Sequence, residues 1–225
     1  RYDDEGELYI GIRGARPPET LSLLFQMAEG SANPDLLPVP VEWRYLSGDR
    51  WLTLHDGHLL SDTTHGLIDS GIVRIALQPA EPSTRLPGDL HWIRASIPYH
   101  ADSVCDAVGV HAQAVSATFV DRQNAPDHLA AKLPERSITG LVQRVAKIAG
   151  ADQPYPSRGG RVAEAEGGFY TRVSERLRHK QRALTIWDYE RLVLERVPDL
   201  YKVKCIPADA ARRPESLGAV DLVVI

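Results

Sequence analysis

Short apolar runs separated by glycine and proline fill the first hundred residues, and they constrain the fold more than any other feature. Residues 41–46 alternate apolar and polar side chains, which is the pattern of a strand with one buried face. A turn at 47–50 joins this run to residues 51–54, its expected hairpin partner. Further strand-like runs lie at 8–12, 72–77 and 92–97. Strands at this spacing predict a β-sandwich or barrel for residues 1–100.

The middle of the chain is less regular. Residues 21–27 and 108–120 are apolar runs for which both a helix and a strand stay open. Residues 123–136 are polar, contain two prolines and are expected to form an exposed connection. Residues 138–148 alternate only weakly. The prolines and glycines of residues 151–161 predict a loop and the best candidate for a domain boundary.

Helical periodicity begins after this loop. Apolar side chains recur at four-residue intervals and so share one face of a predicted helix, namely Phe169, Val173 and Leu177. A parallel stripe on the neighbouring face is cationic and consists of Arg172, Arg176 and Lys180. We expect the apolar face to pack on a sheet and the cationic face to be left for a partner.

A second helix and two strands complete the predicted C-terminal part. Thr185 is a favourable N-cap, with Asp188 at the third helical position, and Pro198 is expected to stop the helix. Residues 201–206 alternate, so that one strand face carries Tyr201, Val203 and Cys205. Residues 221–225 read as a further strand.

The predicted fold class is therefore α+β, with a strand-rich, sandwich-like N-terminal part followed by a smaller unit. In that unit two helices pack on a sheet. The predicted organisation is a β-rich domain over residues 1–100, connecting strands and loops over 101–158, and a helix-helix-strand unit over 159–225.

Composition narrows the classes of protein to which the chain can belong. Its 225 residues have a formal net charge of -4, so the whole chain is not built to bind polyanions. Cys105 and Cys205 lie far apart and indicate reduced, buried thiols. No apolar run approaches the roughly 20 residues of a membrane span, and no signal peptide opens the sequence. Because the chain starts without methionine and ends in an apolar run, we expect it to be a piece of a longer polypeptide.

We find no pattern typical of an enzyme or of a metal or cofactor site. His55, Asp56 and His58, with Asp62 and His65 downstream, match no zinc-binding spacing, and a solvated turn is favoured. The serines lack a nucleophile elbow, and neither cysteine lies beside a recognisable activating base. The glycine pairs form no phosphate-binding loop. The sequence therefore predicts no catalytic residue, no metal ligand and no cofactor.

A dense cationic cluster is the strongest candidate for a functional surface. Its members are Arg172, Arg176, Arg178, Lys180 and Arg182. Nucleic-acid binding is one interpretation, but no aromatic residue is interleaved with these charges. The other two interpretations are a solvated helix face and a surface that meets an acidic partner protein, where arginine is enriched. We assign the five residues as a candidate partner interface.

Three tryptophans in the strand-rich half support a different class of function. Trp43, Trp51 and Trp92 would suit a β-sandwich module that binds carbohydrate or another surface, as in a tail fibre or adhesin. Large aromatic residues in alternating strands mostly pack inward, however, so a core position is favoured for them.

The cationic stretch and its flanks resemble a known family. The similarity runs through Gly159-Gly160-Arg161, Phe169-Tyr170, RVSERLRHK at 172–180, TIWDYERLVL at 185–194 and YKVKCI at 201–206. Upstream, residues 21–30, 41–46, 67–72 and 92–95 are also similar. This order resembles the baseplate J-like wedge proteins of contractile tails and extracellular phage-tail-like injection systems. One departure is Val197 before Pro198, where the family has phenylalanine.

The resemblance implies a structural role without catalysis. It implies that the subunit pairs with a second copy or a related wedge subunit, and that the wedges close into a ring around the spike hub. That ring would hold the first sheath layer and rearrange to trigger contraction. The implied location is a phage-tail-like particle or virion baseplate assembled in the bacterial cytoplasm.

Overall fold

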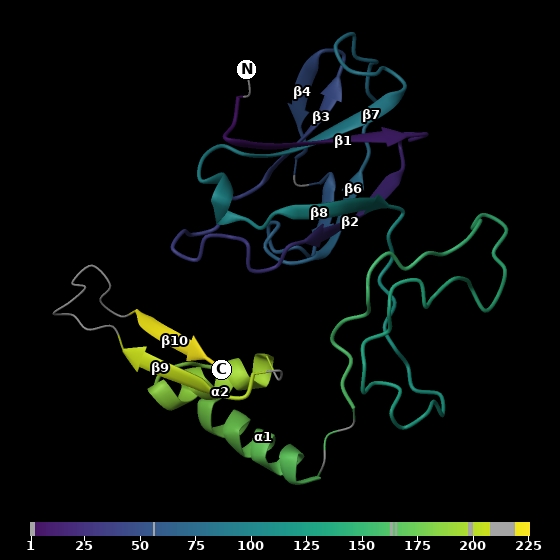
Figure 1. Cartoon of the computed structure of the whole chain (residues 1–225). Helices are drawn as coiled ribbons and strands as arrows, with labels where there is room; N and C mark the ends of the chain where they lie inside the picture. The colour runs from purple at the N-terminus through teal and green to yellow at the C-terminus, as the bar shows by residue number, and fades with distance from the viewer. Residues whose placement is uncertain (1–2, 56, 163, 165, 198–199, 208–218) are drawn as a thin grey trace. The chain divides into compact units, whose positions relative to one another are not determined.

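The chain folds into two compact units, Arg1–Thr118 and Phe119–Ile225 (Figure 1). The computed structural model describes residues 3–55, 57–162, 164, 166–197, 200–207 and 219–225. The first unit holds most of the strands, and the second holds both helices. The predicted α+β class, with a β-rich N-terminal part and a small α+β unit, is confirmed.

The first unit is a sandwich of two four-stranded antiparallel sheets (Figure 1). One sheet has the order β1 (Gly6–Arg13), β7 (Leu90–Ile97), β3 (Glu42–Ser47), β4 (Arg50–Thr53). The other has the order β5 (Leu59–Asp62), β6 (Gly71–Ala76), β2 (Thr20–Met27), β8 (Ala107–Ala112). A short 3-10 helix, Ala101–Ser103, precedes β8.

The core lies between the two sheets. The open choice for residues 21–27 resolves as strand β2, whose alternate residues Leu21, Leu23, Phe25 and Met27 are all buried. The Phe25 ring meets the edge of the Trp43 ring from the opposite sheet, with centroids 5.7 Å apart. An edge-to-face contact between two aromatic rings stabilises the fold by more than the burial of their apolar surface alone. The contact ties one sheet to the other at the centre of the sandwich.

The predicted β3–β4 hairpin is present, with Ser47 paired to Arg50 across a two-residue turn. Gly48 has a φ of 59°, a conformation that glycine adopts without the steric cost of a side chain. Asp49 fixes the neighbouring loop, because its carboxylate accepts hydrogen bonds from the Ser83 and Thr84 hydroxyls at 2.8 and 2.6 Å. The turn is thereby anchored to a second loop of the same unit.

The last strand of the first unit ends at Ala112, although the Ala114 N–H still donates to the Ser22 carbonyl of β2 at 3.1 Å. Of the apolar run at 108–120, only the first part is a strand, and it pairs with β2. From residue 113 to the start of α1, the described residues form neither helix nor strand. Hydrogen bonds join parts of this segment, as where Ser157 and Leu133 exchange two of them at 2.8 and 2.9 Å. The division into residues 1–100, 101–158 and 159–225 stays a proposal. Strand β8 lies in the second of these parts but pairs with β2 and so belongs to the sandwich.

The second unit contains α1 (Glu166–His179), α2 (Ile186–Arg196) and an antiparallel pair of strands, β9 (Val203–Pro207) and β10 (Val220–Val224). The predicted cap of α2 is confirmed as a full capping box. The Thr185 hydroxyl accepts from the Asp188 N–H at 3.2 Å, and the Asp188 carboxylate accepts from the Thr185 N–H at 2.8 Å. Pro198, the predicted stop signal, lies outside the described residues.

The prediction that the apolar face of α1 packs on the sheet is wrong. Helix α2 packs against β9, whereas Phe169 and Leu177 of α1 remain 46% and 70% exposed. Two strands at a spacing of about 4.8 Å form a face about 10 Å wide, which is the width of one helix. Tyr201, predicted to share one strand face with Val203 and Cys205, instead precedes β9 and is exposed, while those two residues are buried.

Candidate protein interface

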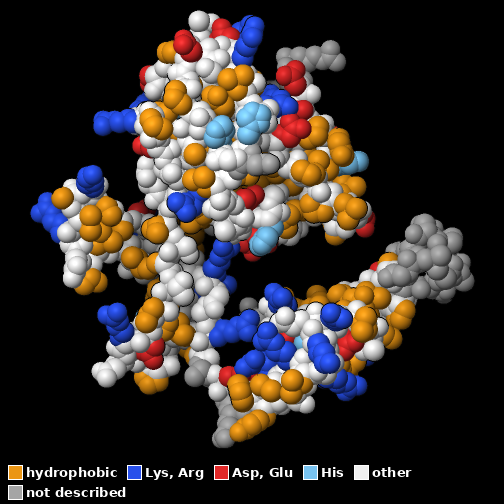
Figure 2. All heavy atoms as spheres, turned by 180° about the vertical axis from the view of Figure 1, so that it is seen from behind, with side chains coloured by type: hydrophobic (Ala, Val, Ile, Leu, Met, Phe, Trp, Pro, Cys, Tyr) orange, Lys and Arg blue, Asp and Glu red, His pale blue; other side chains and the backbone are white. Residues whose placement is uncertain are grey.

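The five cations predicted as an interface lie along the second half of α1 and the turn that follows it. Figure 2 shows many Lys and Arg side chains gathered on this part of the second unit. The helix ends at His179, after which Lys180 and Gln181 both have positive φ, at 48° and 57°. The side chains of the cluster are therefore presented by a helix end and a tight turn rather than by one regular face.

Arg172 forms an internal ion pair. Its guanidinium donates from Nε to Oε1 of Glu164 at 3.2 Å and from Nη2 to Oε2 at 2.9 Å, and it lies 5.5 Å from the centroid of the Phe169 ring. The hydrogen bond to Glu164 raises the pKa of Arg172 above its ordinary value. Bidentate pairing of this kind fixes both partners. Arg172 therefore ties α1 to the segment before it and is not free for a partner.

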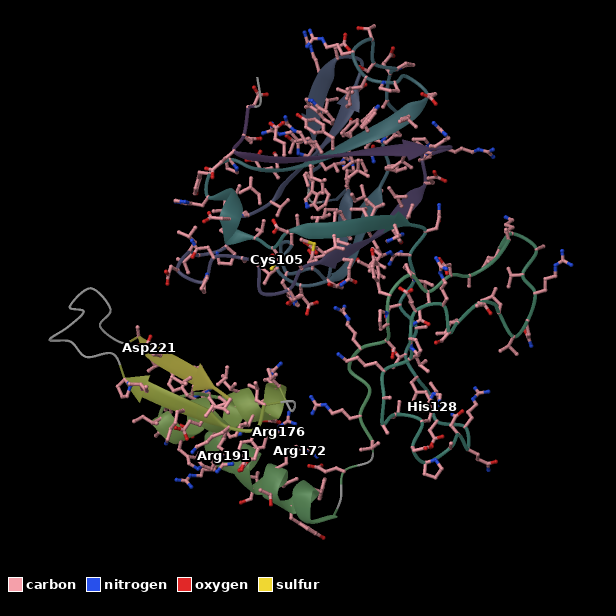
Figure 3. The ribbon with its side chains drawn as sticks, viewed as in Figure 1. Cys105, His128, Arg172, Arg176, Arg191 and Asp221 are labelled. Carbon is pink, nitrogen blue, oxygen red and sulfur yellow. The ribbon has the colours of Figure 1, made fainter. Side chains whose placement is uncertain are left out.

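A second internal contact joins the two helices. The Arg178 guanidinium lies 4.2 Å from the centre of the Trp187 ring of α2, and Arg191 approaches the same ring at 5.7 Å. Arg191 also pairs with Glu175 of α1 at 3.3 Å. Figure 3 labels Arg172 and Arg176 on α1 and Arg191 on α2. The Trp187 ring is thus engaged by arginines within the unit.

The remaining three cations, Arg176, Lys180 and Arg182, are exposed. Among the residues that the structure describes, none of their side chains has an ion-pair or hydrogen-bond partner. Exposed cations without partners keep their full capacity to bind an anionic surface. The structure thus separates the predicted cluster into two cations used internally and three that are free, and we call these three the free cations.

His179 lies within the cationic stretch of the sequence but does not share the exposure of its neighbours. Its ring is buried, with Nε2 3.7 Å from Glu195. Its Nδ1 accepts the backbone N–H of Gln181 at 3.0 Å, which holds the turn after α1. The only sequence signal was its position at the end of the helix, where backbone groups need partners. His179 therefore supports the turn on which Lys180 and Arg182 are presented.

Glu190 of α2 joins the helix to the sheet and was not singled out by the sequence. Its carboxylate accepts the Cys205 N–H and pairs with the Lys204 ammonium, both at 3.1 Å. The hydrogen bond from the Cys205 backbone and the contact with Lys204 lower the pKa of Glu190. This one carboxylate therefore fixes the position of α2 along β9.

Two other groups of residues were candidates for a site, the histidine and aspartate cluster at 55–65 and the three tryptophans. The rings of His55 and His58 lie 6.2 Å apart, His65 pairs with Asp69 at 2.8 Å, and Asp56 lies outside the described residues. No group of three metal-ligating side chains occurs among the residues that are described. Trp43 is in the core, as favoured, but the core position expected for Trp51 and Trp92 is wrong, since both are only half-buried. The Trp51 ring covers the buried guanidinium of Arg94 at 5.2 Å. Trp92 donates to the Pro87 carbonyl at 3.0 Å.

One known protein family matches the chain over nearly its whole length. The family described as baseplate protein PVC11-like matches residues 3–225. A search of curated proteins finds no match. In the part of the chain that the structure describes, no helix is long and apolar enough to cross a membrane. Since the match covers almost all of the sequence, the chain belongs to the PVC11-like family of baseplate proteins and is a structural baseplate component of a phage-tail-like contractile injection system.

Proposed function

We propose that this protein is a wedge subunit of the baseplate. In this role it assembles with a second copy or a related wedge subunit into the ring around the spike hub, and it links that ring to the first sheath layer. The role is structural and involves no turnover, and assembly takes place in the bacterial cytoplasm. The family membership supports contact with other baseplate components, and the resemblance of residues 159–206 to J-like wedge proteins supports the finer assignment.

The observation that carries this proposal is the set of free cations. Arg176, Lys180 and Arg182 stand exposed at one end of α1 in a chain whose formal net charge is -4. Their local positive charge favours an acidic surface on the neighbouring subunit, because complementary charge guides association and selects the partner. Arg172 and Arg178 hold α1 in place through their contacts with Glu164 and Trp187.

The test is co-assembly after charge reversal. We expect the triple variant Arg176→Glu, Lys180→Glu, Arg182→Glu to fold normally and to fail to co-purify with the other baseplate proteins encoded beside it. The matched control reverses three exposed cations elsewhere, Arg16, Arg50 and Lys132, and so changes the net charge equally. It should assemble as the unmodified protein does.

Two further measurements support the test, the salt dependence of complex formation and the effect of breaking the Arg172–Glu164 pair. Complex formation through the free cations should weaken as ionic strength rises, because exposed charges are screened over about 10 Å at 0.1 M salt. Arg172→Glu should disturb the start of α1 rather than the interface itself, since it opposes Glu164. Normal assembly of the triple variant would return the free cations to a solvated surface. A subunit that stays monomeric beside all its baseplate neighbours would overturn the wedge role.

A further inference from the structure

The small sheet of the second unit has one protected edge and one open edge. The N–H and C=O groups of Lys202 and Ile225 are hydrogen-bonded to each other at 3.1 and 2.9 Å. In an antiparallel ladder such pairs alternate with pairs whose backbone groups point away from the partner strand. The outward-pointing groups therefore belong to Val203, Cys205 and Pro207 on β9, and to Val220, Leu222 and Val224 on β10.

The outer edge of β9 is protected by this chain itself. The outward N–H of Cys205 is bound by the Glu190 carboxylate at 3.1 Å. Pro207 has no N–H to offer, and proline is a common device for blunting a strand edge. A further strand cannot pair along β9 without displacing Glu190, whose carboxylate also holds Lys204.

The outer edge of β10 has no such protection. Within the described residues, no hydrogen bond reaches the outward backbone groups of Leu222 or Val224. The side chains of these two residues are 40% and 51% exposed, because α2 packs on β9. A two-stranded sheet is marginal alone, and an apolar strand with an unpaired edge readily accepts another strand.

We propose that β10 pairs antiparallel with β10 of a second copy of this chain, so that the two small sheets become one four-stranded sheet. The pairing is centred on Val223, which places Leu222 of each copy opposite Val224 of the other and joins the unpaired backbone groups. Asp221 is the only charged residue in β10. In this register it lies opposite Ile225 of the second copy, so no like charges meet.

Charge selects this register over the neighbouring one. Centring on Val223 puts Asp221 in the same cross-strand row as Lys202 of the second copy, two strands or about 10 Å away, which a lysine side chain can span. Lys202 has no side-chain partner among the described residues. Centring on Leu222 would instead bring Asp221 into the row of Lys204, which already pairs with Glu190 at 3.1 Å. The inference concerns β10 alone and holds or fails independently of the wedge role.

Disulfide trapping in the 225-residue chain tests the pairing. We expect Val223→Cys to form a covalent dimer under mild oxidation, because the two introduced thiols face each other at the centre of the interface. Ile206→Cys is the control, since Ile206 lies on the same sheet face of β9 and is equally exposed, at 51% against 47% for Val223. The native cysteines are buried and should not interfere.

The result that overturns the proposal is the absence of a dimer for Val223→Cys, or equal dimer formation by both variants. Circular dichroism of the reduced variants verifies that each is folded. Interfaces below about 1,200 Å² are typical of weak complexes, so the reaction is run over a range of protein concentration up to several hundred micromolar. Trapping should rise with concentration for Val223→Cys alone.

A charge exchange supplies a second, non-covalent test. Asp221→Lys and Lys202→Asp should each shift the monomer–dimer equilibrium, measured by sedimentation, several-fold toward monomer. The double variant should recover dimer formation, because it restores opposite charges between copies. Within one chain the two residues lie four pair positions apart along the ladder and do not meet. Additive loss of dimer in the double variant would contradict the proposed register and with it the self-pairing of β10.

Discussion

The sandwich and the helical unit treat their apolar side chains in opposite ways. In the sandwich, residues from both sheets, such as Phe25, Trp43 and Ile93, are almost fully buried. In the helical unit, apolar residues of α1 and β10 remain exposed, and the helices are fixed by a capping box, ion pairs and arginine–tryptophan contacts. The sandwich buries its apolar core residues against one another. The helical unit is held together by polar contacts and leaves apolar surface of α1 and β10 exposed.

Truncation of a core side chain should produce the largest loss of stability, and the same truncation in α1 should produce a much smaller one. Phe25→Ala removes a fully buried ring that touches Trp43 and should destabilise the sandwich by about 3–5 kcal/mol. Phe169→Ala removes a ring of the same size that is about half exposed, and we expect less than about 1 kcal/mol. Urea unfolding of both variants measures the difference. Equal losses would mean that α1 is packed as tightly as the core.

Removal of the α2 cap should have an intermediate effect confined to the helical unit. Thr185→Ala deletes the hydroxyl that accepts the Asp188 N–H and should cost about 1 kcal/mol. Hydrogen exchange resolved by residue should show faster opening of α2 and no change in β2 or β7. Thr185→Ser retains the hydroxyl and is the matched control. Loss of protection across the sandwich would mean that the two regions do not unfold separately.

Acid titration compares one carboxylate from each region. Burial alone would raise the pKa of Asp188, but its hydrogen bonds with Thr185 and Leu184 lower it. The stability that the ionised Asp188 carboxylate adds to the fold is therefore lost as the pH falls through this lowered pKa. Hydrogen bonds from Thr84 and Ser83 lower the pKa of Asp49 from 3.8 to about 2. Both groups stabilise the fold above their unfolded pKa values. NMR titration should give a midpoint of about 2 for Asp49, and a midpoint near 4 would show that its loop contacts do not persist in solution.

The smallest effect on stability should come from the free cations. Reversing Arg176, Lys180 and Arg182 together should change the free energy of unfolding by less than about 0.5 kcal/mol per site, because none of these side chains has a partner among the described residues. Thermal and urea unfolding beside the unmodified protein measure this. A larger loss would show that these cations stabilise the fold rather than contact a partner.

Local patterns in the sequence predicted local structure well. The alternation of residues 41–46, the turn at 47–50 and the Thr185 cap each depend on residues a few positions apart, and each is present. The run at 21–27 needed the structure, because β2 pairs with β6 and β8 from distant parts of the chain and no short-range period fixes that. The strand-rich half and the later α+β unit could be predicted because each is encoded by repeated local signals.

The role of the five cations as a partner interface stays a prediction, and the structure adds contacts around them that the sequence did not reveal. The density of positive charge singled out α1 as a candidate, whereas the internal partners of Arg172 and Arg178 lie eight and nine residues away, outside the helix that carries them. The exposure of Phe169 and Leu177 depends on the width of a two-stranded sheet, which periodicity alone does not reveal. The edge protection by Glu190 depends on how α2 lies against β9. Such contacts between elements have no short-range sequence signal.

Hydrogen–deuterium exchange of the isolated chain, compared with the same chain assembled with its baseplate neighbours, tests most directly whether the helical unit is the region that contacts other subunits. We predict slower exchange on assembly in the last turn of α1, in the turn through Lys180 and Arg182, and along β10. The central strands β2 and β7 should be unchanged, because their amides are already protected by pairing on both sides. Unchanged exchange in α1 and β10, with new protection confined to the sandwich, would contradict the account.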